Sequence, residues 1–192
     1  MIRGVLALLL LPAALRAVEL QIQFAALERM LAEQIFTQDG RRYVHGSQAT
    51  RCNFAYLEKP QIRGEGGRLR IRAHFTGRTA LNVFGQCVGL GDAFDVVILA
   101  RPQYKSGNLG LAEVSASSDG KTGYYIRRVC DALQASLARD FRYPLAEIAQ
   151  KALEDSSGQP GYRRELRNFA VPEVRVSGEA LVLVLDFQLT VK

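Results

Sequence analysis

Apolar and polar residues alternate near the start of the chain, and this pattern then changes period. Between Val18 and Phe24 every second residue is apolar, which is the period of a half-buried β-strand. Between Ala25 and Phe36 the apolar residues recur at steps of three and four, which predicts an amphipathic helix that ends near Gly40. The sequence therefore predicts a strand followed by a helix.

The alternation of apolar and polar residues returns at Tyr43 and largely persists to Ser118. Glycines separate segment 68–75 from two further predicted strands, Phe94–Arg101 and Leu109–Ala116. The pattern predicts an antiparallel meander, and its glycines suit a bent or bulged sheet. Segment 68–75 has an apolar face and a cationic face, made respectively of Leu69, Ile71, Ala73 and Phe75 and of Arg68, Arg70, Arg72 and His74.

A long helical pattern follows, from Thr122 to Leu153. Pro144 removes a helical donor, so we expect a kink or break near Asp140–Tyr143. The chain ends in two extended segments, Phe169–Ser177 and Leu181–Val191. The last segment places six large apolar side chains on one face, for which the long helix is the candidate partner. The predicted fold class is α+β: a curled antiparallel β-sheet wrapped around a long kinked C-terminal helix, plus a short N-terminal helix.

Residues 1–17 have the parts of a secretory signal peptide. Arg3 supplies the positive charge, Val5–Leu11 the apolar run, and the segment ending at Ala17 a cleavage site. The apolar run is shorter than the ~20 residues that span a bilayer. We therefore expect cleavage near Ala17, a periplasmic or secreted location, and one mature domain over residues 18–192.

Three cysteines allow one disulfide and leave one thiol over. Cys52 and Cys87 lie in strand-like sequence flanked by loops, whereas Cys130 lies on the predicted helix. In an oxidising compartment, a disulfide between Cys52 and Cys87 would close the loop between them. If the geometry permits the bond, it would raise the free energy of unfolding by about 3 to 4 kcal/mol. The alternative is that all three are unpaired, small, buried side chains.

The net charge of +6 is mild for 192 residues. Arginines on predicted strands and helices could form a patch for phosphates or for an anionic membrane surface, although charged strand faces commonly just meet water. A nucleic-acid role is not expected, because the charge is modest and no aromatic stacking motif is present. The arginines in question are Arg68, Arg70, Arg72, Arg78, Arg127, Arg128, Arg163, Arg164 and Arg167.

Catalytic motifs are weak in this chain. Its two histidines, His45 and His74, are too few for a histidine-rich metal site, and no glycine-rich stretch has the Lys-Ser/Thr ending of a P-loop. An enzyme would need a convergent pocket around His74, Asp92 or Asp95. We therefore predict a non-enzymatic protein with no catalytic residue, no metal site and no cofactor.

The order of the elements and the closing pattern from Val174 to Leu185 resemble the tubular lipid-binding (TULIP) superfamily, which includes proteins like bactericidal permeability-increasing protein. The resemblance is to its small periplasmic bacterial members and covers Val18 to Val191. It implies a long helix wrapped by a curled sheet, with an acyl chain between them. Some such relatives are lipoproteins with a cysteine at the cleavage point, whereas no cysteine precedes Cys52 here, which implies a soluble protein.

This resemblance places a candidate ligand groove between the sheet and the long helix. We predict a protein that binds or shuttles a lipid or another hydrophobic molecule without covalent chemistry. An envelope assembly protein whose apolar groove binds a partner segment is the alternative. Core packing is the ordinary role of such residues and is the alternative for each of them. The candidate lining residues are Phe75, Leu81, Val83, Phe94, Val96 and Ile98 on the sheet, and Ile126, Leu133 and Leu137 on the helix.

Overall fold

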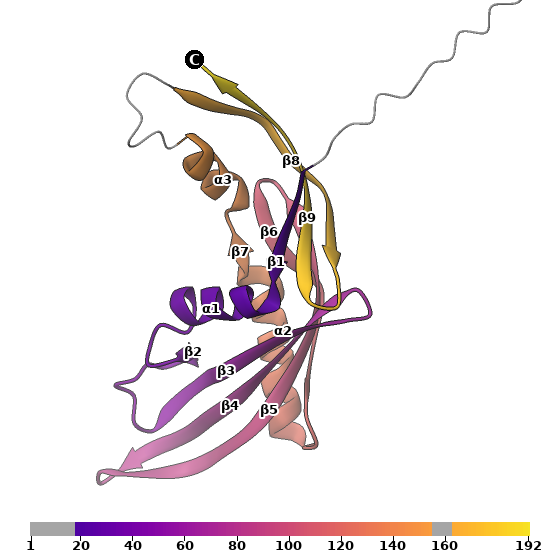
Figure 1. The fold of residues 1–192 in the computed structure, drawn as a ribbon. Helices are drawn as coiled ribbons and strands as arrows, with labels where there is room; N and C mark the ends of the chain where they lie inside the picture. The colour runs from indigo at the N-terminus through magenta and orange to yellow at the C-terminus, as the bar shows by residue number, and fades with distance from the viewer. Residues whose placement is uncertain (1–17, 155–162) are drawn as a thin grey trace, which may run out of the picture.

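The computed structural model describes residues 18–154 and 163–192 (Figure 1). The predicted signal peptide, its cleavage site at Ala17 and the predicted turn at 156–161 lie outside the described residues. The described chain forms a six-stranded antiparallel sheet, a three-stranded antiparallel sheet and three short helices.

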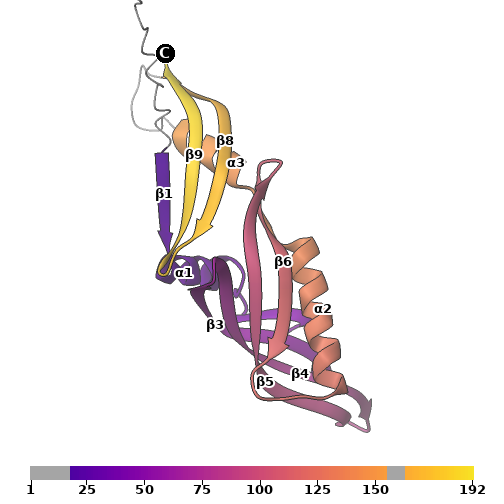
Figure 2. The same cartoon turned by 90° about the vertical axis from the view of Figure 1, so that its right-hand side faces the viewer.

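The six-stranded sheet is a meander in which each strand pairs with the next one along the chain, as predicted. Strands β4 and β5 are 16 and 20 residues long, far beyond the usual five or six. Their hairpin reaches the end of the molecule opposite the C-terminus (Figures 1 and 2). The strands are β2 (Arg41–His45), β3 (Asn53–Glu65), β4 (Arg68–Val83), β5 (Gln86–Lys105), β6 (Asn108–Ser118) and β7 (Arg142–Tyr143).

Helices α1 (Phe24–Gln34) and α2 (Tyr124–Asp140) pack on one face of this sheet, which we call the inner face. Figure 2 shows α2 running beside β6. α1 is also fastened to β3, because the Glu28 carboxylate accepts a hydrogen bond of 2.6 Å from the backbone N–H of Ile62. Apolar side chains of the sheet and of both helices meet in one core, which includes Phe24, Leu57, Ala73, Phe75, Phe94, Val96, Ile98, Ile126, Cys130 and Leu133.

The second sheet has the order β1-β9-β8. Its apolar side chains form a smaller core with the start of α3 and with β6, so the last strand is covered by several elements and not by one long helix. Only the first half of the strand's apolar face is buried, and Leu189 and Val191 are exposed. The elements are β1 (Val18–Gln23), β8 (Arg164–Val176), β9 (Ala180–Val191) and α3 (Leu145–Glu154), and the core residues are Leu109, Leu145, Val171, Leu181 and Leu183.

The predicted α+β fold around a long kinked helix is wrong, because the protein is mainly β and the described chain ends in strands. The segment predicted as one helix divides into α2 and α3. At the predicted break, Phe141 is extended and residues 142–143 pair with β6. Pro144 explains the break, since proline forces the preceding residue out of helical geometry and supplies no N–H donor. α3 then packs against β8, where the Glu154 carboxylate accepts the backbone N–H of Leu166 at 2.9 Å.

The two sheets meet where the β3–β4 hairpin crosses the β8–β9 turn. Gly64 lies against Ser177 so closely that a Cβ at position 64 would overlap the Ser177 carbonyl oxygen. A backbone hydrogen bond from Phe24 N–H to the Glu179 carbonyl, 3.0 Å long, ties the start of α1 to the same turn. Glycine at position 64 is therefore required by a close backbone approach.

The variant Gly64→Ala tests this joint. We expect its free energy of unfolding to fall by about 1 to 3 kcal/mol, because the added Cβ meets a backbone atom that cannot rotate aside. Gly178→Ala is the matched control, since a Cβ there has no heavy atom within 4 Å. Urea unfolding of both variants measures the difference, and equal stability of the two would contradict the described joint.

Candidate functional site

The structure separates the nine predicted groove residues into two groups. Six are buried in the core of the inner face, and Leu137 packs partly against them. Leu81 and Val83 lie elsewhere and are exposed, Leu81 to 76%. Two hollows on the described surface are lined by other, mostly polar residues. The six buried residues are Phe75, Phe94, Val96, Ile98, Ile126 and Leu133.

Leu81 and Val83 continue the inner face beyond the part that the helices cover. In the β4–β5 pair, Phe75 lies opposite Phe94, and Leu81 lies opposite Val88. Because side chains alternate between faces at period two, these residues and Leu90 share the inner face. Leu90 is 75% exposed, and Val88 is also exposed. The core face of the sheet therefore runs out into solvent along this hairpin.

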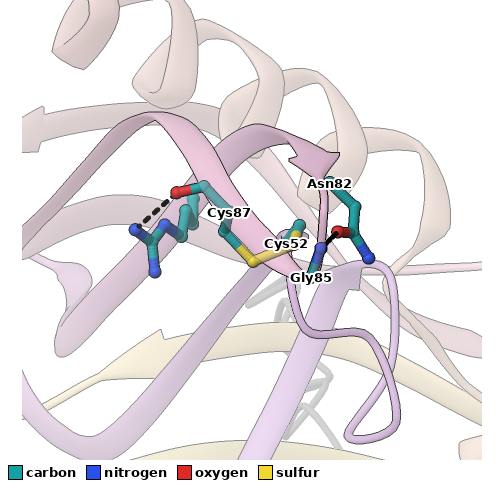
Figure 3. The surroundings of a disulfide bond; sticks show 5 residues. Cys52, Asn82, Gly85 and Cys87 are labelled. Carbon is teal, nitrogen blue, oxygen red and sulfur yellow. Dashed lines mark hydrogen bonds between the residues drawn. A yellow bond between two sulfur atoms is a disulfide. The ribbon is translucent and has the colours of Figure 1, made fainter.

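The turn of the hairpin adds one more exposed apolar side chain. Phe84 is 103% exposed and has a φ of 49°, and Gly85 follows with a φ of 83°. Two successive residues with positive φ are the pattern of a type I′ hairpin turn. The Asn82 side-chain oxygen accepts the Gly85 N–H at 2.9 Å and braces this turn (Figure 3). We call Leu81, Val83, Phe84, Val88 and Leu90 the apolar hairpin end.

A disulfide joins Cys52 to Cys87, as predicted, across 35 positions of the chain (Figure 3). Cys87 pairs with Asn82 in the register of the hairpin, so the bond fastens the loop before β3 to the outer face near the turn. Cys130 is free and buried in the core, and this burial raises the pKa of its thiol. The remaining thiol is therefore a core side chain.

A polar cluster lies on the inner face between the core and the apolar hairpin end. The Lys121 ammonium lies 2.7 Å from Asp92 and lowers the pKa of that carboxyl. Tyr125 at the start of α2 lies over Gly77, where a Cβ would come within 2.9 Å of the tyrosine hydroxyl. Burial, and then the charge of Asp92, raise the pKa of Tyr125. These residues close the core at its edge.

The outer face carries an ion-pair network centred on Asp95. Its carboxylate lies 2.8 Å from His74 Nδ1 and 2.8 Å from Arg72, which also contacts Asp119 at 3.2 Å. His74 and then Arg72 lower the pKa of Asp95 by hydrogen bonding. The network borders a hollow of about 340 Å³ beside the β-bulge of β3, where Lys59 has a φ of 54°.

The structure thus brings together His74 and Asp95 but places Asp92 on the opposite face of the sheet. No serine, threonine or cysteine lines the hollow beside His74, so no hydroxyl or thiol nucleophile is among its lining residues. The arrangement holds two strands and a histidine in place by charge-assisted hydrogen bonds.

Sequence reasoning identified Leu81 and Val83 and missed Phe84, Val88 and Leu90. A signal for Val88 and Leu90 was present in the sequence. Val88, Leu90 and Phe94 lie at alternate positions of one strand face, and only Asp92 interrupts this apolar series. Phe84 lies in the turn, where alternation gives no information about exposure. The alternation of apolar residues along a strand also does not show how far a helix covers that strand.

Three further findings concern the site as a whole. In residues 18–154 and 163–192, no group of three or more His, Cys, Asp or Glu residues is placed to hold a metal ion. None of the helices described for these residues is long and apolar enough to cross a membrane. The chain matches no protein-family model, no curated protein and no solved structure. The TULIP resemblance therefore stays a prediction.

The variant Asp95→Asn tests the outer-face network. The pKa of Asp95 is lowered in the folded protein, so its ionised form stabilises the fold above about pH 4, and this contribution disappears as the pH falls through the folded pKa. We expect the variant to be less stable than the parent at pH 7 and the deficit to shrink below about pH 4. Urea unfolding of the parent and the variant between pH 7 and about pH 3 measures this stability difference. Asp186→Asn is the control, and an Asp95→Asn deficit independent of pH would contradict the assigned interaction.

Proposed function

We propose that this chain is an extracytoplasmic, non-catalytic protein that binds or shuttles the hydrophobic part of a lipid, or a similar hydrophobic molecule, on its apolar hairpin end. The observation that carries the proposal is the exposure of this set of side chains. Four of the five, Leu81, Val83, Val88 and Leu90, continue the core face of the sheet into solvent. A grouped set of exposed large apolar side chains marks a binding surface more often than it marks an ordinary surface.

Packing in the core favours this open site over a groove between the sheet and α2. Phe75, Phe94 and Val96 are each at most 3% exposed and belong to the same buried core cluster as side chains of α2. An acyl chain placed there would have to displace a packed core, which costs free energy. On the hairpin the same kind of ligand would cover side chains that water now covers, which is favourable.

The disulfide gives modest support to the proposed location. Such bonds persist in oxidising compartments and are uncommon in the reducing cytosol. The signal peptide over residues 1–17 and the release near Ala17 remain predictions from the sequence, and they point to the same compartment.

A partner protein of the cell envelope is the second candidate for the ligand. The openness of the site favours it, because an exposed strand face can also receive an apolar segment of another chain. A site that prefers free lipid should take up an isolated acyl probe, whereas a site built for a protein segment should not.

The variant Leu90→Ser tests the site with a fluorescent fatty acid as the probe. We expect the parent to bind the probe and the variant to bind it about tenfold more weakly or worse, because a large apolar side chain contributes about 1.5 kcal/mol or more when it is covered. Leu90 is 75% exposed, so its replacement leaves the core intact. Val191→Ser, at an exposed site on β9, is the matched control. A parent that takes up no probe, or equal binding by both variants, would refute the proposal.

A further inference from the structure

Phe84 occupies a position that neither packing nor backbone conformation explains. The side chain is fully exposed, so it adds nothing to the core. Its φ of 49° lies in the left-handed region, where asparagine, aspartate or glycine is the ordinary choice at this position of a type I′ turn. Phenylalanine is therefore unfavourable in the free protein on both counts. Such local strain is found at sites where the residue has a binding role.

The turn that carries Phe84 is braced by nearby bonds at an extremity of the molecule. The Asn82 side chain braces the turn, and the Cys52–Cys87 disulfide lies within three positions of Phe84 in the hairpin (Figure 3). The hairpin projects past α2 at the end of the molecule opposite the C-terminus (Figures 1 and 2). A flat surface could therefore reach Phe84 without a change in the fold.

The charges around this extremity are almost all positive. Segments 47–53 and 76–91, which the disulfide joins, contain two arginines, Arg51 and Arg78, and no carboxylate. Arg51 and Arg78 have no carboxylate partner among the described residues, and Arg78 donates instead to the Cys87 carbonyl at 3.3 Å. The next carboxylate along β5, Asp92, is paired with Lys121, as described above.

We propose that the apolar hairpin end docks on a membrane surface that carries anionic headgroups, with Phe84 inserted among the lipids. The unpaired arginines then contact lipid phosphates, with which guanidinium groups form bidentate hydrogen bonds. Aromatic and aliphatic side chains beside a cationic rim are the composition of segments that lie in a membrane interface. This inference rests on the proposed function, because it names the surface at which the same hairpin acquires or releases its lipid.

Charge also decides against a second copy of this chain as the occupant. Pairing two hairpin ends would bring the arginines of both copies together with few carboxylates to compensate them. A lipid surface that carries phosphates has the opposite charge and needs no specific register. A soluble acidic protein would pair with the arginines but would not bury the projecting phenylalanine. An anionic lipid surface does both, because its phosphates pair with the arginines and its acyl chains cover Phe84.

The absence of tryptophan from the sequence allows a direct experiment on the mature chain, residues 18–192, with its disulfide intact. Phe84→Trp places a single fluorophore at the tip, and Val191→Trp places one at the opposite end of the molecule. Both are mixed with vesicles of phosphatidylglycerol and phosphatidylcholine in equal parts, or of phosphatidylcholine alone, in which a portion of the acyl chains is brominated to quench tryptophan. Sedimentation of the unlabelled parent, Phe84→Ser and Arg78→Gln with the same vesicles gives the affinities.

We expect blue-shifted and quenched fluorescence for Phe84→Trp on the anionic vesicles, and unchanged fluorescence for Val191→Trp. Phe84→Ser should lose about tenfold or more in vesicle affinity, and Arg78→Gln should lose affinity for the anionic vesicles while weakening the effect of salt. Absence of vesicle binding, or equal quenching at both positions, would overturn the docking. If the parent still takes up the soluble fatty acid, only the docking fails. If it binds vesicles but no fatty acid, the docking stands and the proposed lipid site fails.

Discussion

The structure depends on the continuous pairing of β4 with β5, from Leu69–Ala100 to Val83–Gln86. An antiparallel pair keeps each side chain on one face for its whole length, so a face that begins as core stays apolar wherever its alternate positions are apolar. α1 and α2 pack on the part of this face that includes Phe75 and Phe94 and leave Leu81 and Leu90 exposed. The difference in length between the hairpin and its covering helices therefore creates both the core and the exposed surface.

This mismatch has a thermodynamic consequence. A two-stranded ribbon that projects from a sheet is marginally stable by itself, and its exposed apolar side chains do not stabilise it in the free protein. The Cys52–Cys87 bond compensates by tying the ribbon to the loop before β3, and the polar contact between Lys121 and Asp92 closes the core where the helix begins. The hairpin is thus kept in shape by a covalent bond and by turn hydrogen bonds, which leaves its apolar side chains uncovered and available to a ligand.

Much of the chain's local structure could be predicted from the sequence, because period two and the helical period are local properties. They located the meander, α1, both final strands and the break before Pro144, and the cysteine contexts predicted the disulfide. The path after Pro144 could not be predicted, since the direction of α3 is decided by its contact with β8. The same limit applied to the site: alternation showed that Phe75 and Leu81 share a face, but not that α2 covers the first and leaves the second exposed.

The division of the inner face into a sealed core and an open hairpin is tested most directly by NMR of methyl-labelled leucine and valine side chains with a nitroxide-labelled fatty acid. A ligand on the hairpin broadens the methyl signals of Leu81 and Leu90 and leaves those of Val96 and Leu133 sharp. Selective broadening of Val96 and Leu133 would place the ligand between the sheet and α2 and would contradict the account.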